Sequence, residues 1–424
     1  MRTTRNKADT ELVRQQNRSL VLEALRRHGP LASIELGSKT GLSPATISAI
    51  TNDMLCERLI RMDEEETART RRPQRGRPKV KLTLDANAAL ILGISISHNL
   101  IRFMLADYCG AVRARKAVNL ETATLSADEF AALLTDCAKS FLSENAVEIS
   151  HIAIASVTCQ GSVDTKRGEI IWSPAFNARP IAVAAPLEEA LGVQCLVAND
   201  TNAIAHLLHV EDASLGTSFA VLYLGSGIGL GLIVNNALLE GTDGSASEFG
   251  HMVWARNGAI CRCGRRGCIE AYAADFGIFR SAEGGLEGVP PAAIAPTKAE
   301  MHALAARARA GEPQALAAFS QAGAAIGDGL SNLVMLLNPQ RILLAGPGTA
   351  HLDLLEKGLK QGLAHAATNG DSPALTVLDD PRDLEEAGLF ALAYTRLDRE
   401  NFAKRVSVEE VAARRENSMA PSIV

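Results

Sequence analysis

The N-terminal part of the chain carries apolar residues at helical spacing. Val21 and Leu22 lie four and three residues before Leu25. This pattern predicts a helix over residues 17–28, which ends at the Gly-Pro pair that follows it. A second short helix is expected over residues 32–40. The charged residues between the apolar positions are then free to face water.

A short turn follows the second helix and leads into a third. Gly41 suits the tight turn, and Ser43 can accept hydrogen bonds from the first backbone N–H groups of the next helix. Pro44 suits the first position of that helix. Short helices joined in this way are typical of a helix-turn-helix motif.

The third helix divides into an inner and an outer face. Ile47, Ile50 and Met54 recur at spacings of three and four residues and should face the core. The other positions are free to meet the major groove of DNA. The predicted DNA-contacting residues here are Ser43, Ala45, Thr46, Ser48, Ala49 and Asn52. A small three-helix unit can also serve as a protein-docking module, and this helix alone does not separate the two interpretations.

A basic segment follows an acidic turn at residues 63–66. Its members are Arg69, Arg71, Arg72, Arg75, Arg77, Lys79 and Lys81. Arg75 and Arg77 flank a glycine, and such a narrow basic stretch suits the minor groove of A·T-rich DNA, where the negative potential is strongest. A solvated linker is the alternative. We therefore predict a winged helix-turn-helix DNA-binding domain over residues 1–82, with this segment as its wing or linker.

From residue 83 onwards the pattern is that of alternating strands and helices. Strands are expected near 89–97, 100–107, 112–118, 150–157, 195–198, 217–224 and 230–236, helices near 126–142 and 201–209, and both in alternation from 313 to about 399. A similar order of elements occurs twice, which predicts two α/β lobes with a cleft between them over residues 83–400. Residues 401–424 are expected to form a C-terminal tail.

Composition is consistent with this division. With 424 residues, 47% of them hydrophobic, the chain can form two or three domains with substantial cores. A formal net charge of −5 argues against a protein that coats nucleic acid with its whole surface, so DNA binding should be confined to local clusters. No run of about eighteen apolar residues and no apolar signal segment appears. These features predict a cytoplasmic protein that does not associate with membranes.

One stretch, residues 248–270, carries the ligand types of a metal site. His251, Cys261, Cys263 and Cys268 follow one another at spacings that suit a single tetrahedral zinc ion, with carboxylates at Glu248 and Glu270. Three thiolates and one imidazole leave no open position for water, so the predicted zinc is structural. The alternative is a set of ordinary buried or redox-active cysteines. The other five cysteines are scattered and read as reduced single residues.

Four motifs together resemble those of the ROK family (repressors, open reading frames, kinases), and of its transcriptional regulators in particular. They are Glu248-x-Gly-His251, Cys261-x-Cys-Gly-x-x-Gly-Cys268-x-Glu270, Asn199-Asp200-x-Asn202 and the glycine-rich stretch from Leu224 to Gly231. The resemblance implies an actin/hexokinase-like fold with a sugar bound between the lobes. The sugar-binding residues that it implies are Asn199, Asp200, Glu248, His251 and Glu270, with Gly161 as a further candidate.

The resemblance also raises the question of catalysis. In kinases of this family the residue matching Asp200 takes the proton from the sugar hydroxyl. Their first phosphate loop reads Asp-x-Gly-Gly-Thr, whereas this chain has Ser95-Ile96-Ser97-His98-Asn99. The acid that would organise magnesium and the glycines that admit phosphate are both replaced. We therefore expect no catalytic residues and no enzymatic activity.

The sequence thus favours a sugar-responsive transcriptional regulator. We expect it to repress carbohydrate-utilisation genes. Its expected partners are operator DNA and a monosaccharide or sugar derivative that closes the cleft. A homodimer or higher homo-oligomer is expected because helix-turn-helix proteins read paired half-sites. Two alternatives remain open: an ATP-dependent sugar kinase with a DNA-binding appendage, and a regulator controlled by a protein partner.

Overall fold

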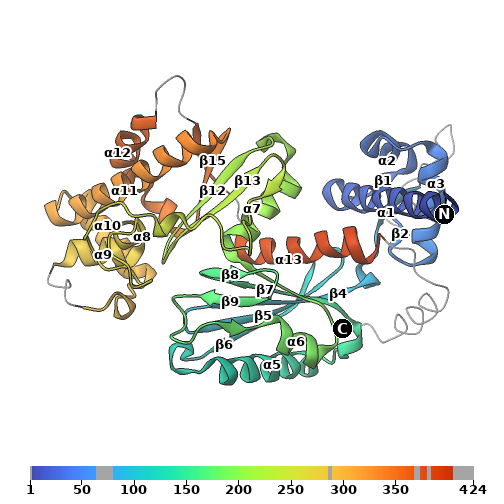
Figure 1. Cartoon of the computed structure of the whole chain (residues 1–424), viewed down its shortest axis with the longest axis horizontal. Coiled ribbons are helices and arrows are strands. Elements are labelled where there is room, and N and C mark those ends of the chain that lie inside the picture. The colour runs from blue at the N-terminus through green and yellow to red at the C-terminus, as the bar shows by residue number, and fades with distance from the viewer. Residues whose placement is uncertain (1, 64–79, 285–288, 367–372, 380–382, 404–424) are drawn as a thin grey trace, which may run out of the picture.

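The chain forms an N-terminal unit and two α/β lobes, with helix α13 (Leu384–Arg396) running between the lobes (Figure 1). The computed structural model describes residues 2–63, 80–284, 289–366, 373–379 and 383–403. Arg75 and Arg77, and the predicted tail from residue 404 onwards, lie outside the described residues. No helix among the described residues is long and apolar enough to cross a membrane.

The N-terminal unit is a winged helix-turn-helix, which confirms the predicted fold class. Its elements are α1 (Arg2–His28), β1 (Leu31–Ala32), α2 (Ser33–Thr40), α3 (Pro44–Cys56), β2 (Ile60–Met62) and β3 (Lys81–Leu84). The strands form an antiparallel sheet in the order β1-β3-β2. Helix α1 begins at Arg2, well before the expected start at residue 17. Its first half has no apolar period, but it also contains no glycine or proline that would end a helix.

The turn between α2 and α3 is built as expected. Gly41 adopts φ 72°, a left-handed conformation that glycine accepts without strain. Ser43 caps α3, since its Oγ accepts a hydrogen bond from the Thr46 N–H at 3.2 Å. Ile47 and Met54 are fully buried under the helix. The opposite face of α3 is therefore the one left for a partner.

Lobe I is a five-stranded sheet covered by helices on both faces. Its order is β11-β7-β4-β5-β6, formed by β4 (Leu90–Ser97), β5 (Leu100–Asp107), β6 (Val112–Asn119), β7 (Ile152–Cys159) and β11 (Cys195–Asn199). Helices α5 (Ala127–Glu144) and α6 (Ala184–Leu191) cover one face, and α13 covers the other. A smaller sheet of β8 (Ser162–Asp164), β9 (Glu169–Trp172) and β10 (Ile181–Ala182) lies beside it.

Lobe II repeats this sheet. Its order β14-β13-β12-β15-β16 again has three consecutive antiparallel strands followed by two parallel additions, and comprises β12 (Phe219–Leu224), β13 (Ile228–Val234), β14 (Ala237–Leu238), β15 (Arg341–Ala345) and β16 (Ala374–Val377). The prediction of two comparable α/β halves is confirmed. Helix α7 (Asp200–Glu211) leaves lobe I at the end of β11 and packs on β13 and on α13.

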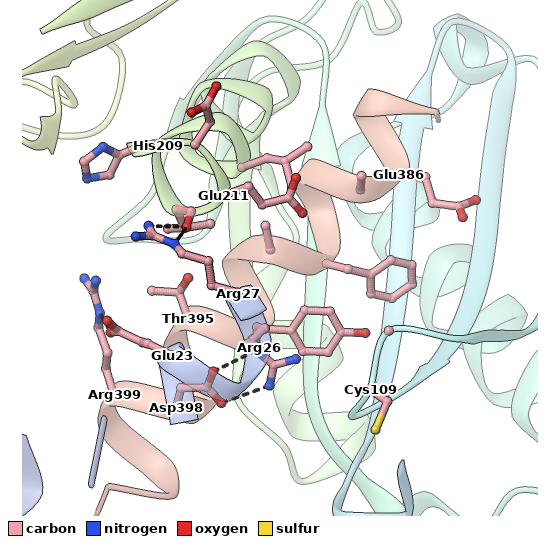
Figure 2. A pocket seen from close by; sticks show the side chains of 18 of the residues that line it. Glu23, Arg26, Arg27, Cys109, His209, Glu211, Glu386, Thr395, Asp398 and Arg399 are labelled. Atoms are coloured by element: carbon pink, nitrogen blue, oxygen red, sulfur yellow. Dashed lines mark hydrogen bonds and ion pairs between the residues drawn. The ribbon is translucent and has the colours of Figure 1, made fainter. Parts of the chain in front are cut away.

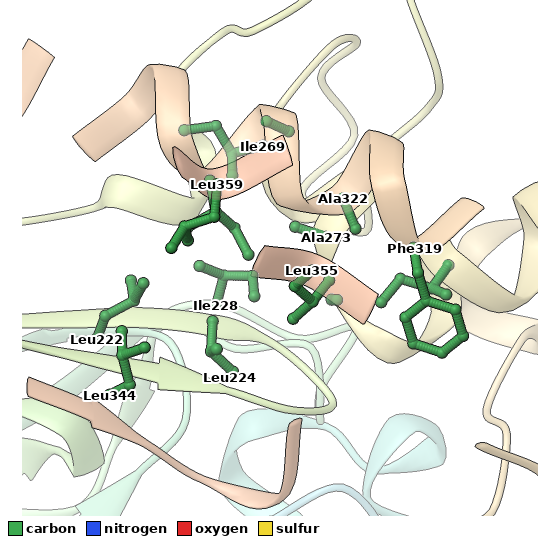
Figure 3. Packing of buried hydrophobic residues seen from close by; sticks show 14 of the residues in the cluster. Leu222, Leu224, Ile228, Ile269, Ala273, Phe319, Ala322, Leu344, Leu355 and Leu359 are labelled. Carbon is green, nitrogen blue, oxygen red and sulfur yellow. The ribbon is translucent and has the colours of Figure 1, made fainter. Parts of the chain in front are cut away.

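A large apolar core joins the lobe II sheet to its helices. Leu222, Leu224 and Leu344 of the sheet face Phe319 and Leu355 (Figure 3). The helices are α8 (Glu270–Ala273), α9 (Asp275–Glu283), α10 (Lys298–Arg309), α11 (Pro313–Leu337) and α12 (Leu352–Leu363). The sequence pattern did not predict α9 and α10. This core holds the start of α8, which ends the cysteine-rich stretch, against the sheet.

The N-terminal unit is docked on lobe I through a shared core. Val21 and Leu25 of α1 belong to the same buried cluster as Met104 of β5 and Leu389 of α13. Phe402, at the start of the stretch predicted as a tail, is also buried in this cluster. A continuous core of this kind anchors the DNA-binding unit on lobe I.

Candidate functional site

The site begins where β11 ends and α7 begins. Asn199 caps α7, because its Oδ1 accepts hydrogen bonds from the N–H groups of Thr201 and Asn202 at 2.9 and 3.0 Å. Its Nδ2 donates to the Gly161 carbonyl at 2.9 Å. A Cβ on Gly161 would lie 2.3 Å from the Trp172 carbonyl oxygen, so only glycine fits there. These contacts bring together Gly161, Asn199 and the first residue of α7, Asp200.

Asp200 has an unusually high pKa for a carboxyl group. Burial, followed by the nearby Glu385 carboxylate, raises its pKa to about 7, although hydrogen bonds from Thr201 oppose the shift. The Thr201 N–H donates to Asp200 Oδ1 at 2.7 Å. A carboxyl group that titrates near neutrality can both donate and accept hydrogen bonds to a hydroxylated ligand.

Glu248 and His251 form the facing wall. His251 Nε2 lies 3.8 Å from Glu248 Oε2, and burial raises the pKa of Glu248. The Trp172 ring meets the His251 ring edge-on, with 5.0 Å between their centroids. The three side chains thus present a carboxyl group, an imidazole and an aromatic ring to one cavity, which also contains Asn199 and Asp200.

The four predicted metal ligands come together. The ligand atoms of His251, Cys261, Cys263 and Cys268 all lie within 4.8 Å of one another. Cys263 Sγ lies 3.8 Å from Cys268 Sγ, and Cys261 Sγ lies 3.7 Å from His251 Nδ1. Two sulfurs that bind one zinc ion tetrahedrally, each at about 2.3 Å, lie about 3.8 Å apart. The donor set and its spacing fit a four-coordinate metal ion.

Backbone contacts explain how the loop reaches this arrangement. The Cys261 N–H donates to the Arg265 carbonyl at 2.8 Å, which closes the turn around Cys263. Gly267 has φ 80°, and a Cβ there would lie 1.8 Å from the Ala255 carbonyl oxygen. Hydrogen bonding from Cys261 and His251 lowers the pKa of the Cys263 thiol and so favours the thiolate, the form that binds metal.

Glu270 links the metal cluster to the glycine-rich stretch. The Cys261 thiol donates to Glu270 Oε1 at 3.5 Å, while Glu270 Oε2 accepts from the Ile228 N–H at 3.4 Å. His251 completes the link, since its Nδ1 faces the sulfurs and its Nε2 faces Glu248. A shift of the metal loop therefore moves the wall of the cavity.

The cavity between these walls is small. Its volume is about 50 Å³, whereas ligand pockets usually measure about 300–1,000 Å³. The expectation that a ligand closes the cleft stays a prediction, and this conformation leaves only this small volume between the residues of the two lobes. The lining residues that were not predicted include Gln160, Trp172 and Ser247. Two of them carried a signal in the sequence, since Trp172 is one of only two tryptophans and Ser247 precedes Glu248.

An ion-pair network lies beside Asp200 where the sequence departs from the kinase pattern. Arg102 binds Asp383 at 2.9 Å and Glu385 at 2.8 Å, and it donates to Ser95 Oγ at 3.3 Å. The Tyr223 hydroxyl donates to Glu385 Oε1 at 2.7 Å. This network places two carboxylates next to the replaced phosphate loop. Sequence reasoning missed it, because its members come from four separate elements.

The predicted DNA-contacting residues of α3 lie on its open face. Ser43, Ala45, Ser48, Ala49 and Asn52 are exposed, and Thr46 is half-buried beside the Ser43 hydroxyl. The structure thus brings together five of the residues on α3 and Ser43 at its N-cap.

Comparison with known proteins agrees with this arrangement. The xylose repressor of Bacillus spizizenii is 27% identical over 340 residues, 80% of this chain and 83% of that protein. The DNA-binding transcriptional dual regulator NagC of Escherichia coli K12 is 24% identical over 386 residues, 91% of this chain and 93% of NagC. A crystal structure of a ROK family transcriptional regulator, a homologue of the E. coli Mlc protein, has a TM-score of 0.75 and 22% identity and covers 92% of this chain and 99% of that chain.

The glycine-rich stretch and the cysteine-rich loop both lie within the segment that a family model recognises. The ROK family model matches residues 91–390, well over half of the 424 residues. The chain belongs to the ROK family.

Proposed function

We propose that the protein is a sugar-responsive transcriptional regulator. The observation that carries the proposal is the core shared by α1, β5 and α13, because it joins a DNA-reading unit to the lobes that form the site. The relatives support it, since one is named a xylose repressor and another a DNA-binding transcriptional regulator. Such a protein acts in the cytoplasm and, like other helix-turn-helix proteins, as two copies on paired half-sites.

The chemistry of the cavity favours a monosaccharide or sugar derivative. Asn199, Asp200 and Glu248 offer amide and carboxyl groups, which can bind adjacent hydroxyls in pairs. His251 Nε2 faces the same space, and Trp172 offers an apolar ring surface. Sites built to hydrogen-bond hydroxyl groups discriminate strongly between ligands. Because a monosaccharide is larger than this cavity, binding would move the lobes relative to each other, and this movement would be the signal.

We propose structural zinc at the cluster of His251 and the three cysteines. Zinc prefers a tetrahedral set of sulfur and nitrogen ligands, and a complete set leaves no position for water or substrate. The ion would fix the loop and hold His251 in the orientation that presents Nε2 to Glu248. Its role is thus to shape the sugar site, and no chemical step passes through it.

The same geometry argues against phosphoryl transfer. Glu385 and Asp383 place negative charge beside Asp200, where a kinase would bring the anionic phosphates of ATP. Ser95 and Ser97 stand where the magnesium-organising acid and a glycine would be needed. Under the kinase alternative, Asp200 could act as the base, but the site offers no place for ATP.

The test is DNA binding by the purified, zinc-loaded protein at fixed salt concentration. The probe is the DNA upstream of its own gene, with D-xylose, D-glucose, N-acetyl-D-glucosamine and the 6-phosphates of the last two added separately. Specific binding that one sugar changes supports the regulator. Sugar-dependent ATP turnover without specific DNA binding would establish the kinase. Specific DNA binding, with neither a sugar effect nor thermal stabilisation by any sugar, would favour control by a protein partner.

A further inference from the structure

Helix α7 reaches from the sugar site to the DNA-binding unit. It begins at Asp200, and its carbonyl at Val210 accepts a hydrogen bond from Arg27 Nε of α1 at 2.8 Å. Arg27 Nη2 donates to the same carbonyl (Figure 2). At 1.5 Å per residue, the twelve residues of α7 span about 18 Å. A cation at the end of a helix is also favoured by the helix dipole.

Helix α7 packs closely on lobe II. Glycines of β13 let the two elements approach closely, since a Cβ on Gly229 would lie 2.1 Å from Thr201 Oγ1 and one on Gly231 would lie 2.6 Å from Ala205 Cβ. Residues 201–205 of α7 are buried. A displacement of lobe II therefore acts on α7 through this close packing.

Helix α13, in contrast, is fixed to lobe I. The Ser156 hydroxyl of β7 donates to the Leu389 carbonyl at 2.8 Å, and a Cβ on Gly93 would lie 2.7 Å from Leu389 Cδ2. Between α7 and α13, Gly388 packs against the Ala203 backbone, and His206 Nε2 lies 2.9 Å from Thr395 Oγ1, within hydrogen-bonding distance. Packed helices can shear by small sliding movements, which here would also disturb this hydrogen bond. A relative movement of the lobes would act on this surface.

Two neighbouring residues of helix α1 bind different partners: Arg26 binds the lobe I side, and Arg27 binds helix α7. Arg26 is held on the lobe I side, where it binds Asp398 at 2.8 and 3.0 Å and the Tyr108 carbonyl at 2.9 Å. Its guanidinium also lies 4.2 Å from the Tyr394 ring centroid. Arg27, the next residue, binds α7. Movement of α7 relative to α13 would therefore displace α1 at Arg27, next to Arg26, which lobe I holds in place.

A cavity of about 1,370 Å³ lies between helices α1, α7 and α13. Leu20 and Ala24 of α1, Leu207 of α7 and Phe390 of α13 are among its lining residues. Figure 2 shows Arg27 reaching from α1 to α7 at its edge. Because the space is not filled by packed side chains, α1 has room to tilt when α7 moves.

We propose that Arg27 is the positioning residue that transmits sugar-dependent movement of lobe II to the DNA-binding unit. The inference rests on the proposed function, because it needs a sugar that alters DNA affinity. Arg27 acts through the Val210 carbonyl and touches neither sugar nor DNA. Without it, α1 is attached to lobe I alone, and the DNA-binding unit no longer responds to movement of α7.

The experiment compares Arg27→Ala with the wild-type protein in DNA titrations with and without the sugars named above. The ratio of the two DNA dissociation constants measures coupling, which is typically about 5–150-fold. We expect Arg27→Ala to reduce this ratio to within about twofold of one, while sugar affinity without DNA is retained. Arg27→Lys, which keeps a cationic donor, should restore part of the ratio. By reciprocity, sugar titrations with and without DNA must give the same ratios.

Arg399→Ala is the matched control. Arg399 pairs with Glu23 of α1 at 2.7 Å beside the same cavity, but it follows α13 and belongs to the lobe I side. This variant should keep the wild-type ratio. A wild-type ratio that persists in Arg27→Ala overturns the link and leaves the proposed function standing. A ratio of one for every sugar in the wild-type protein overturns the proposed function and the link together.

Discussion

Arg18 and Glu57 form a buried ion pair inside the N-terminal unit, with 2.5 Å between Arg18 Nη2 and Glu57 Oε2. Their side chains are 0% and 5% exposed. Arg18 also donates to the Phe402 carbonyl at 3.0 and 3.2 Å. One guanidinium thus joins α1, the end of α3 and the segment that follows α13.

The first prediction concerns this pair. Glu57→Ala should lower the free energy of unfolding of the N-terminal unit by about 3–5 kcal/mol, because it leaves a buried guanidinium without its counter-charge. Denaturant unfolding of the full chain measures the change. Replacing Arg18 by Met in the same variant should recover part of the loss, and a double variant no more stable than Glu57→Ala would contradict the electrostatic explanation.

The second prediction concerns the metal cluster. Cys263→Ser should remove bound zinc, because the remaining ligands no longer complete the tetrahedral set. Elemental analysis after dialysis gives the zinc content. Cys137→Ser, at a half-buried cysteine of α5 away from the cluster, is the matched control and should keep full occupancy. DNA binding without sugar should survive in both variants, and full zinc in Cys263→Ser would exclude the ligand assignment.

The third prediction concerns Asp200 and pH. Its pKa is about 7 in the folded protein against an ordinary value of 3.8, so the folded state keeps a proton that the unfolded chain releases. Its contribution to stability is therefore most favourable below pH 4 and falls as the pH rises to 7. Asp200→Asn removes this dependence. At about 1.4 kcal/mol per pKa unit, it should be more stable than wild type by up to about 4 kcal/mol at pH 8.

Thermal unfolding between pH 4 and pH 8 tests this expectation. The difference between Asp200→Asn and wild type should shrink toward zero at pH 4, where the carboxyl is protonated in the folded state and close to half-protonated in the unfolded chain. An equal difference at both ends of the range would show that the substitution acts through packing. Sugar binding should also weaken, because the amide cannot accept at both positions.

The fourth prediction concerns the open face of α3. Asn52→Ala should weaken specific DNA binding by about 1–3 kcal/mol, the usual effect of removing a side chain that binds a base. Asn87→Ala changes an exposed asparagine in the short helix η1 (Ala86–Ala88) outside the helix-turn-helix and serves as the control. Equal affinities for the two variants would remove Asn52 from the DNA interface.

The fifth prediction concerns the basic segment. Replacing Arg75 and Arg77 together by Ala should weaken DNA binding and flatten its salt dependence, by nearly one unit of log–log slope for each phosphate that an arginine no longer neutralises. Titrations at several salt concentrations give the slope. If the slope does not change, the segment is a linker.

The sequence predicted best what depends on local spacing. Ser43 as a cap, and the clustering of the four side chains from His251 to Cys268, depend on short stretches, so they could be inferred from neighbouring residues. The two lobes followed from alternating strand and helix patterns. Periodicity failed for α9 and α10, and for the first half of α1, whose residues are mostly polar.

What the sequence could not predict depends on contacts between distant segments. Arg102 meets Glu385 across 283 positions, and Arg26 meets Asp398 across 372. Each of these residues looks like an ordinary surface charge when the sequence is read alone. Only folding shows that one pair lies beside Asp200 and that the other holds the DNA-binding unit.

The small volume of the cavity, about 50 Å³, also bears on the sensitivity of the proposed response. If only a fraction of molecules is open at any moment, the apparent dissociation constant equals the intrinsic constant divided by that fraction. The half-maximal sugar concentration then depends on the resting equilibrium between the lobes as much as on contacts in the pocket. Substitutions at the Gly388 and Ala203 contact should therefore shift the dose-response curve without touching the sugar.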